Sequence, residues 1–466
     1  MTQLWELDAV ELAGLIRTGR TSSVEVVDAH IQRMEAVNPH INAVVLALTD
    51  EARQLAETAD CAVRHGDALG PLHGVPVTTK VNIDQAGCPT DNGVVALRDF
   101  VAEQDSPTVA NLKNAGAVVL GRTNTPAYSM RWFTENELHG NTLNPWDQSR
   151  TPGGSSGGAA ASVAAGMVPV GQGNDIAGSV RYPAYCCGLV GLRPSYGRAP
   201  TYNPSLKGAG RPVTAQLMAV QGPLTRSVRD ARVAMQVMSQ RDVRDPKWVN
   251  VPFDGPPVHR PMKVAVVENP AGRGVSDSVR RAIQQAAGWL ADAGYLMEAV
   301  EPPELGRVAD LWAELAMDDT IKAMMPDVER HGDAGIRRAV GYWIEGVPAT
   351  SAEGVLLALQ ERERLLRAWE IFMEDYPLIL MPSSGEQVFP VGLDIQAFSD
   401  YQRIWNAQLP QLAIPVLGVP AIAVPTGLDD GLPAGVQLSA ARYREDLCLE
   451  AAAVIEARSG GLGVAP

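Results

Sequence analysis

The chain has 466 residues, of which 46% are hydrophobic, and its formal net charge is −14. This length and apolar fraction are enough to bury a large core, in one big domain or two. The acidic balance argues against nucleic acid as a partner, because phosphate contacts need clustered Lys and Arg. No apolar run reaches the ~18–20 residues that a membrane span requires, so we also expect no membrane partner.

The N-terminal residues, Met1 to Asp8, lack the basic segment followed by an apolar one that marks a secretory leader. Five cysteines are present, an odd number with no Cys-x-x-Cys ligand spacing: Cys61, Cys88, Cys186, Cys187 and Cys448. These features predict a cytoplasmic protein with reduced thiols, no zinc and no other cofactor.

The first 65 residues have the pattern of amphipathic helices. Asp8 is placed to cap one helix that ends near Gly19, and Thr21 to Ser23 are placed to cap a second. The second helix is expected to run to about Val37 and to end at Asn38-Pro39. A strand over residues 41–48 and a helix over residues 50–63 then complete this region.

A short strand is predicted just before Lys80. Val75, Val77 and Thr79 alternate with their neighbours in a strand-like pattern, and Lys80 comes at the end of that run. Most lysines are solvated surface charges, but an apolar strand favours burial of this one. Burial disfavours the ammonium form and lowers the pKa, so Lys80 is a candidate neutral base near pH 7. A helix over 105–115 and a strand over 117–120 continue an α/β rhythm.

The stretch from Thr151 to Arg181 is nearly uncharged and rich in Gly, Ser and Ala. A tight turn over 153–158 carries Ser155 and Ser156, and residues 159–166 favour a helix because Ala has the best helix propensity. Residues 167–170 have strand character, and a second turn over 171–178 leads to Ser179. Closely spaced glycines let backbone N–H groups converge beside a serine, as an oxyanion hole requires.

Three other interpretations of this stretch are weaker. A flexible linker would be polar and without periodicity, whereas here glycines bracket a helix and an apolar run. Gly153 to Gly157 fits a Gly-x-Ser-x-Gly nucleophile elbow, but turn sequence precedes it and only His259 and His331 follow. A phosphate-binding loop would end in Gly-Lys-Ser/Thr, which is missing.

The second half of the chain alternates between α/β and helical patterns. Strands over 263–267 and 296–300 flank a helix over 276–293, and residues 304–376 are helical with many charges. Three tryptophans in that helical region are assigned to its core: Trp312, Trp343 and Trp369. Strands over 378–381 and 415–424 are then expected to return to the same sheet.

Several separated blocks of this sequence resemble the amidase signature family, the Ser–cis-Ser–Lys amide hydrolases. The blocks are Gly74 to Asp84, Gly121 to Asn124, Thr134 to Asn136, Asn144 to Trp146, the serine stretch through Ala184, and Gly418 to Gln437. The 24-residue interval between Ser155 and Ser179 also fits the family pattern. The resemblance covers most of the chain.

The resemblance implies one α/β domain over residues 1–466, with a central mixed sheet covered by helices on both faces. Within it we expect N-terminal helices over 1–65, a catalytic core over 66–300, a helical lobe over the site at 304–376, and a return to the core sheet over 377–466.

The resemblance also implies a mechanism. Ser179 would attack the substrate carbonyl and form an acyl-enzyme, Ser155 would sit on a cis peptide bond and shuttle the proton, and Lys80 would be the base. The oxyanion would be held by backbone N–H groups of Ile176, Ala177, Gly178 and Ser179. Ser156, Asp175 and Arg181 are expected to support the site, with Asp175 and Arg181 holding the turn.

Two positions depart from the family pattern. Val81 stands where an aspartate usually follows the lysine, and Ala177 stands where the family usually has glycine. Loss of a nearby carboxylate would favour neutral Lys80 further. A methyl group at Ala177 could narrow the oxyanion turn, or be harmless if its φ is negative.

The expected reaction is hydrolysis of a small, hydrophobic or aromatic amide, hydrazide or carbamate. Four bulky residues are assigned to the substrate pocket: Met130, Arg131, Trp132 and Tyr182. Two alternatives stay open, an amidotransferase component that needs a partner protein and a non-catalytic binding protein on the same fold. A homodimer is also compatible with the resemblance.

Overall fold

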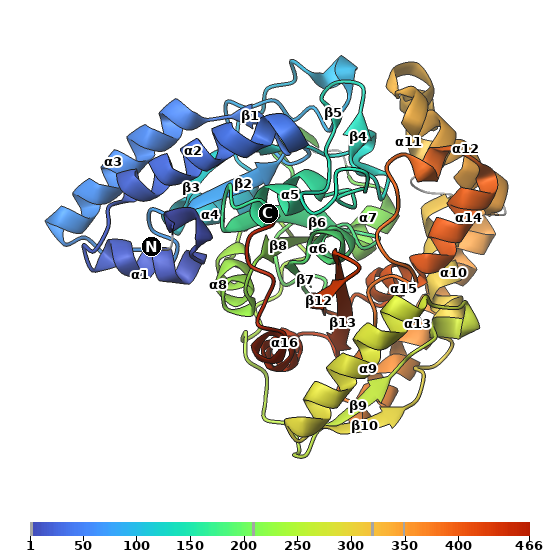
Figure 1. The fold of residues 1–466 in the computed structure, drawn as a ribbon. Coiled ribbons are helices and arrows are strands. Elements are labelled where there is room, and N and C mark those ends of the chain that lie inside the picture. The colour runs from blue at the N-terminus through green and yellow to red at the C-terminus, as the bar shows by residue number, and fades with distance from the viewer. Residues whose placement is uncertain (1–2, 207–209, 318–320, 348–349) are drawn as a thin grey trace.

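A mixed β-sheet runs through the centre of the molecule, and helices cover both of its faces (Figure 1). The computed structural model describes residues 3–206, 210–317, 321–347 and 350–466. The strands of this sheet are β1 (Val44–Ala47), β2 (Pro76–Lys80), β3 (Val118–Thr123), β6 (Val170–Asp175), β7 (Val190–Arg193), β8 (Val220–Thr225), β9 (Lys263–Val266), β10 (Leu296–Ala299), β11 (Leu378–Pro382), β12 (Ala421–Asp429) and β13 (Leu432–Ala440).

The sheet has two parallel groups of three strands separated by an antiparallel centre, and β1 is an antiparallel edge strand beside β3. Across the described residues its 11 strands lie in the order β1-β3-β2-β6-β8-β7-β12-β13-β11-β9-β10. Neighbours are parallel from β3 through β2 to β6, and again from β11 through β9 to β10. The other neighbouring pairs are antiparallel. A small second sheet pairs β4 (Glu135–Asn136) with β5 (Gly140–Asn141).

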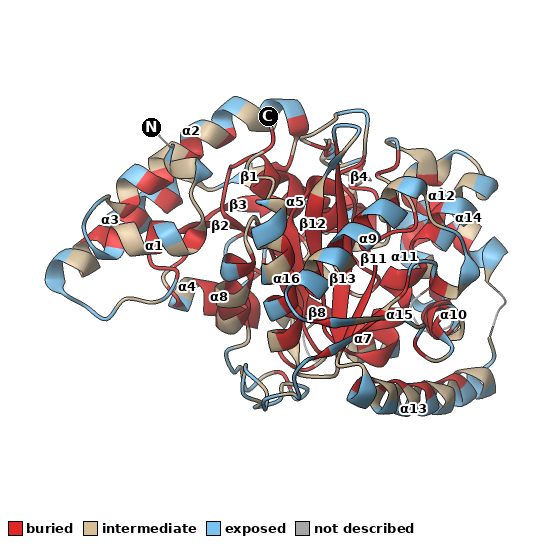
Figure 2. Cartoon of the chain, turned by 60° about the horizontal axis from the view of Figure 1, so that its bottom comes forward, coloured by how far each residue is buried: buried red, intermediate tan, exposed pale blue. Residues whose placement is uncertain are grey.

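Successive residues of a strand point to opposite faces of a sheet, and both faces of this sheet are buried (Figure 2). In β11, Leu378 and Leu380 join one apolar cluster, whereas Ile379 and Met381 join another on the opposite side. This two-sided burial explains why β11 has a continuous apolar run rather than an alternating pattern.

One face of the sheet shares its apolar cluster with the helices α1 (Ala9–Arg17), α4 (Pro107–Asn114), α8 (Val228–Met238), α9 (Asp277–Asp292) and α16 (Glu445–Ser459). The other face is covered in two parts. One part holds α2 (Ser23–Ile41), α3 (Thr49–His65), α5 (Gly157–Ala164), α6 (Arg181–Cys187) and α14 (Phe398–Ala407). The second part holds α7 (Val213–Met218), α10 (Leu305–Ala316), α11 (Lys322–His331), α12 (Ala334–Gly346), α13 (Ala352–Asp375) and α15 (Leu409–Leu417). The predicted α/β fold, with a mixed sheet covered by helices on both faces, is confirmed.

In the described ranges, no helix has the length and apolar character needed to cross a membrane.

The end of α2 differs from the prediction, because the helix continues through Pro39 to Ile41. Pro39 lies in the last turn and is exposed, so the missing N–H removes one helical hydrogen bond at an end that water reaches. The side-chain oxygen of Asn38 accepts hydrogen bonds from the N–H groups of Ala43 and Val44, and the helix ends at Asn42 in the left-handed conformation.

The second glycine-rich turn is shorter than predicted, since residues 170–175 form β6. Position 173 in this strand is glycine because the loop before α5 packs directly on it. A Cβ atom at Gly173 would lie 2.9 Å from the Oγ of Ser156. The glycine therefore serves close packing, and only residues 176–180 make the turn that carries Ser179.

The strand predicted over 415–424 is wrong in its first half. Residues up to Leu417 belong to α15, Gly418 ends that helix in the left-handed conformation, and β12 begins at Ala421. An apolar run buried on all sides has the same composition in a helix and in a strand, so periodicity could not separate them.

Two helical glycines give a matched test of this packing. Replacing Gly158 by Ala would put a Cβ 2.4 Å from the backbone N of Asn124, whereas a Cβ at Gly288 meets nothing within 4 Å. We expect Gly158→Ala to lower the free energy of unfolding by about 1–3 kcal/mol and Gly288→Ala to raise it by about 0.5–1 kcal/mol. Thermal unfolding midpoints of both variants would measure this, and shifts in the same direction would contradict the packing described.

Candidate active site

Three segments meet on one side of the central strands to form the candidate site. Lys80 is the last residue of β2, Ser155 and Ser156 immediately precede α5, and Ser179 lies in the turn between β6 and α6. β2 pairs directly with β6, and α5 packs on both strands. The sheet register therefore brings Lys80 to the level of the β6 residues that precede Ser179.

Lys80 is fully buried and its amine faces oxygen atoms of neutral side chains. Its Nζ lies 2.7 Å from Ser155 Oγ, 3.2 Å from Ser156 Oγ and 3.0 Å from Asn174 Oδ1. No carboxylate among the described residues forms an ion pair with it. Burial lowers the pKa of Lys80 well below its ordinary value, and the more distant charge of Asp175 opposes this only in part. The environment favours a neutral amine.

The two candidate serines line one cavity. Ser155 and Ser179 both contribute to its wall, together with Asn174 and Ile176. The peptide bond between Gly154 and Ser155 is cis, as the family resemblance implies. The N–H of Ser156 donates to the carbonyl of Ser179 at 3.2 Å, which ties the two turns together.

A buried ion-pair cluster holds the turn that carries Ser179. Arg181 contacts both carboxylate oxygens of Asp175, at 3.0 and 3.1 Å, and Arg193 contacts one of them at 3.2 Å. The same carboxylate accepts hydrogen bonds from the N–H groups of Gly178 and Val180. Burial alone would raise the pKa of Asp175, but the two guanidinium groups hold it well below its usual range. Asp175 is therefore a fixed anion, positioned to hold the turn as expected.

The backbone N–H groups of this turn differ in what they contact. The N–H of Gly178 donates to Asp175 Oδ1 at 2.9 Å, so it is committed to the turn itself and the expectation that it faces an oxyanion is corrected. In the parts of the chain that the structure describes, the N–H groups of Ile176, Ala177 and Ser179 donate to no acceptor. Gly178 has φ of 90°, a conformation that favours glycine, whereas Ala177 is not among the described residues with positive φ.

Two tryptophans fix the orientation of this turn. Trp312 Nε1 donates to the carbonyl of Ile176 at 2.7 Å, and Trp132 Nε1 donates to the carbonyl of Ala177 at 2.7 Å. The C=O and N–H of a trans peptide unit point in opposite directions. Holding the carbonyl of Ile176 therefore directs the N–H of Ala177 away from Trp312, and holding that of Ala177 directs the N–H of Gly178 toward Asp175.

A narrow aromatic compartment of about 80 Å³ opens beside Ser179. Its wall is mostly aromatic and apolar, formed by Met130, Trp132, Ile176, Trp312, Trp343, Tyr401 and Trp405. Trp312 and Trp343 stack with their rings 5.2 Å apart, and Trp405 packs against Trp343 at 5.7 Å. Trp312, Trp343 and Trp369 are all buried in the apolar core as expected, and Trp312 and Trp343 also line this compartment.

The expected pocket residues have different positions in the structure. Met130 and Trp132 line the aromatic compartment, and Arg131 reaches it while its guanidinium is bound to Asp394 at 2.8 Å. Tyr182 lies elsewhere. It is fully buried in α6 and stacks on Tyr185, so the expectation of a pocket position is corrected. Tyr182 is close to Ser179 along the chain, but its helix directs the side chain into the core.

A second, more polar compartment of about 280 Å³ also lies against Ser179. Amide and hydroxyl side chains line it, among them Asn82, Ser129, Asn174 and Gln221, together with Arg211 and apolar residues such as Ile83 and Leu206. Ser155 belongs to this compartment and is absent from the aromatic one. Ser179 therefore lies where an aromatic and a polar compartment meet.

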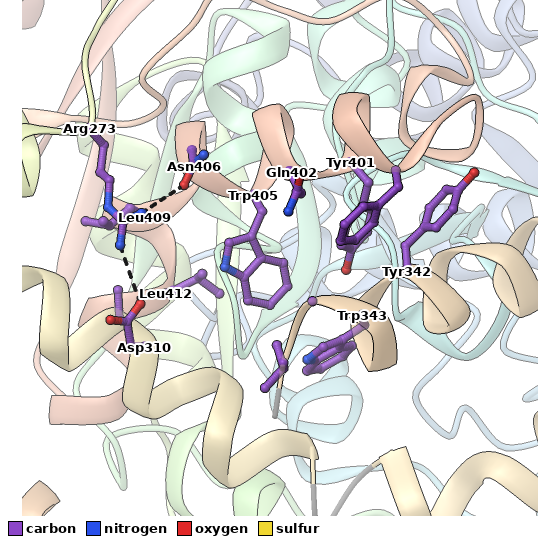
Figure 3. A pocket seen from close by; sticks show the side chains of 14 residues that line it. Arg273, Asp310, Tyr342, Trp343, Tyr401, Gln402, Trp405, Asn406, Leu409 and Leu412 are labelled. Atoms are coloured by element: carbon purple, nitrogen blue, oxygen red, sulfur yellow. Dashed lines mark hydrogen bonds and ion pairs between the residues drawn. The ribbon is translucent and has the colours of Figure 1, made fainter. Parts of the chain in front are cut away.

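A third cavity, of about 370 Å³, lies behind the aromatic wall (Figure 3). Trp343, Tyr401 and Trp405 line both this outer cavity and the aromatic compartment, so their rings form the partition between the two. Arg273 lies at one end of the outer cavity, near Asp310 and Asn406. Within the described ranges, no group of three or more His, Cys, Asp or Glu side chains is arranged to hold a metal ion.

Comparison with known proteins agrees with this geometry. The Amidase family profile matches residues 25–449. The chain belongs to the amidase signature family. It is 44% identical over 460 residues to an indoleacetamide hydrolase of Bradyrhizobium diazoefficiens, covering 98% of this chain and 88% of that one. It is 31% identical to a glutamyl-tRNA(Gln) amidotransferase component of Acidothermus cellulolyticus, covering 98% of this chain and 95% of that one.

Solved structures of the same family superimpose over nearly the whole amidase. A bacterial aryl acylamidase matches with a TM-score of 0.84 at 28% identity, covering 98% of this chain and 97% of that one. A 6-aminohexanoate cyclic dimer hydrolase bound to its substrate matches with a TM-score of 0.83 at 29% identity, covering 98% of each chain. The protein is an amidase, a hydrolase that acts on amide bonds, and the prediction of an amidase rather than an amidotransferase component is confirmed.

Several residues of the amidase site were not singled out from the sequence. Asn174 contacts Lys80, and Arg193 contacts Asp175. Asn174 could have been found from the sequence, because it directly precedes Asp175 in the serine stretch. Trp405 and Tyr401 come from α14, more than two hundred positions after Ser179, and only the fold brings them to the site. No local pattern marks such residues.

The buried amine of Lys80 predicts a specific pH dependence. A protonated Lys80 cannot accept a proton, so kcat/KM should rise as the pH passes upward through its lowered pKa. We expect this acid limb to lie well below the ordinary lysine value of 10.5. The measurement is kcat/KM against pH on a chromogenic anilide, with circular dichroism at each pH as the control for folding. An acid limb at the ordinary lysine value would contradict a desolvated base.

The hydrogen bond from Trp312 to the turn predicts a selective loss in kcat. Trp312→Phe keeps an aromatic ring but removes the N–H, so the Ile176 peptide should lose its fixed orientation. We expect kcat to fall about tenfold or more, below the ~10²–10³-fold loss from removing an oxyanion donor outright.

Trp369→Phe is the matched control for this variant, because Trp369 Nε1 donates to the carbonyl of Pro303 at 2.8 Å in the core. It should lower the thermal midpoint and leave kcat unchanged. Equal kcat values for the two variants would mean that the bond to Ile176 has no role in turnover.

Proposed function

We propose that this amidase hydrolyses the amide of an arylacetic acid, with indole-3-acetamide as the leading example, to the carboxylic acid and ammonia. The observation that carries the mechanism is the buried Lys80 amine, 2.7 Å from Ser155 Oγ, beside a cavity that Ser155 shares with Ser179. A serine hydroxyl is a weak nucleophile until a base accepts its proton. The Lys80–Ser155 pair supplies that base.

In the first half of the reaction, Ser179 Oγ attacks the amide carbonyl carbon. Its proton passes to Ser155, and the proton of Ser155 passes to Lys80. The C–N bond then breaks, the proton returns through Ser155 to the nitrogen, and ammonia leaves. The remaining product is an ester between the arylacetyl group and Ser179.

In the second half, water takes the place of ammonia beside Ser155. Its proton passes through Ser155 to Lys80 as the water oxygen attacks the ester carbon. The ester C–O bond then breaks, Lys80 returns the proton through Ser155 to Ser179 Oγ, and the carboxylic acid forms. Ser156 and Asn174 hold Lys80 in position through both halves, since each contributes an oxygen within 3.2 Å of Nζ.

The negative charge on the carbonyl oxygen needs fixed donors in both halves. The N–H groups of Ile176, Ala177 and Ser179 are the candidates, since among the described residues they have no other acceptor. Asp175 and Arg181 hold the turn in shape, so these donors need little rearrangement during the reaction.

Two observations support an arylacetyl group as the acyl part. The aromatic compartment beside Ser179 is small and is lined by Trp132, Trp312, Trp343 and Trp405, a wall that suits an aromatic ring. The relative that is 44% identical over nearly the whole chain is an indoleacetamide hydrolase. Hydrazides and carbamates of the same acyl size remain within the proposed substrate class.

The test is a hydrolysis panel on the purified chain alone, without any partner protein. We expect ammonia release from indole-3-acetamide and phenylacetamide to exceed that from acetamide, because only the former fill the aromatic compartment. Ser179→Ala and Lys80→Met should each lower kcat by on the order of 10⁴–10⁶-fold, as removal of one member of a catalytic unit does. Retained thermal midpoints would exclude unfolding as the cause.

Undiminished turnover by Ser179→Ala would overturn the mechanism, and a preference for acetamide would overturn the acyl class. If the purified chain hydrolyses none of the amides, the result would favour the partner-dependent or the non-catalytic alternative.

A further inference from the structure

The two compartments beside Ser179 have different chemical roles under the proposed function, on which this inference rests. Ser155, which returns the proton to the leaving nitrogen, lines only the polar compartment. The leaving amine must therefore depart on the polar side, and the acyl group must occupy the aromatic side. A primary amide releases only ammonia, yet the polar compartment has a volume of about 280 Å³. This space exceeds what ammonia needs.

Arg211 gives the polar compartment a positive charge. The residue is half-buried, and one guanidinium nitrogen, Nη2, donates to Thr201 Oγ1 at 2.8 Å. In the described ranges the other guanidinium N–H groups have no partner, and no carboxylate lies within ion-pair distance. Arginine in proteins normally meets a carboxylate or phosphate with both arms of its planar fork. Here one arm is open to the cavity.

The surrounding charges leave the Arg211 guanidinium largely uncompensated. The nearest carboxylate, Asp245, reaches it only through Thr201, whose hydroxyl donates to Asp245 at 3.1 Å. Asp175 also lines the compartment, but Arg181 and Arg193 already neutralise it. Burial lowers the pKa of Arg211, as expected for a charge removed from water without a direct ion pair.

We propose that Arg211 binds a carboxylate on the leaving amine, so that the amidase also cleaves N-arylacetyl amino acids. The scissile bond joins the arylacetyl carbonyl carbon to the amino acid nitrogen. Ser179 forms the ester with the arylacetyl group, and the nitrogen takes the proton from Ser155 and leaves as the free amino acid. Water then releases the arylacetate, so one water is consumed and no oxidant or other co-reactant is needed.

Neutral polar groups complete the recognition of an amino acid. Asn203 and Gln221 line the same compartment and offer side-chain N–H donors without adding a competing charge, whereas the Asn82 amide is bound to Ser129 and Asn174. An acidic cavity would repel the carboxylate, and an apolar one would leave it unsolvated. A guanidinium among amides is the arrangement that a carboxylate-bearing group requires.

The first experiment compares N-(indole-3-acetyl)glycine with its neutral isostere, N-(indole-3-acetyl)glycinamide, as substrates of the full-length enzyme. We expect kcat/KM to favour the acid over the isostere by roughly 10- to 100-fold, typical of one charge-assisted pair. Analogues in which β-alanine or γ-aminobutyrate replaces glycine lengthen the chain between the scissile nitrogen and the carboxylate. The analogue with the highest acid-to-isostere ratio then indicates the distance from that nitrogen to Arg211. Equal kcat/KM for acid and isostere, with every spacing, would overturn the proposal.

Arg211→Gln and Arg211→Lys form the matched pair of variants. The Gln variant removes the charge and should lower the acid-to-isostere ratio about tenfold or more, whereas Lys should restore part of it. Both ratios are internal to one protein, so a loss of overall stability does not change them. An unchanged ratio in the Gln variant would mean that the carboxylate is bound elsewhere.

Binding to Ser179→Ala separates this inference from the proposed function. Calorimetric titration of Ser179→Ala, and of the double variant with Arg211→Gln, measures affinity for N-(indole-3-acetyl)glycine without turnover. Arg211-dependent binding, with no hydrolysis of indole-3-acetamide by the wild type, would support the carboxylate site and overturn the proposed function. Serine-dependent cleavage of indole-3-acetamide without any Arg211-dependent binding would support the function and overturn the carboxylate site.

Discussion

The burial of one amine among neutral oxygens is the constraint on which the rest of this structure depends. Lys80 must be removed from water and kept away from carboxylates to stay neutral, and it must still lie within hydrogen-bond distance of Ser155. Each of these conditions is met by the core. β2 is buried along its whole length, and the loop before α5 packs so closely on β6 that Gly173 has no room for a side chain.

The anion nearest to this amine is made harmless in the same core. Asp175 is buried a few residues from Ser179, and an unpaired carboxylate there would favour protonated Lys80. Arg181 and Arg193 compensate it instead, and its remaining lone pairs accept backbone N–H groups of the nucleophile turn. A buried ion pair is often no more stabilising than apolar packing. This cluster has a positional role, since it fixes the turn while leaving other N–H groups free of acceptors among the described residues.

Part of the wall of each compartment comes from segments outside the catalytic ones. Trp312 and Trp343 belong to α10 and α12, Trp405 to α14, and Arg211 to the segment just before α7. Trp312 both lines the aromatic compartment and holds the carbonyl of Ile176. The acyl wall and the orientation of the nucleophile turn are thereby coupled through one side chain, so a change in the substrate pocket also affects the geometry of the turn.

The sequence by itself determined the fold class, the family and the positions of Lys80, Ser155 and Ser179, because these depend on local spacing and on residue types with few alternatives. The strand before Lys80, the helix after Ser156 and the supporting role of Asp175 could be predicted from short stretches. The tertiary structure decided that Trp312 and Trp343 line a cavity and that Tyr182 does not. It also decided that Gly178 donates to Asp175 and that Arg211 shares a cavity with Ser155. The physical reason is that a pocket wall is a surface shared by distant segments, and no local pattern records which face of a helix meets that surface.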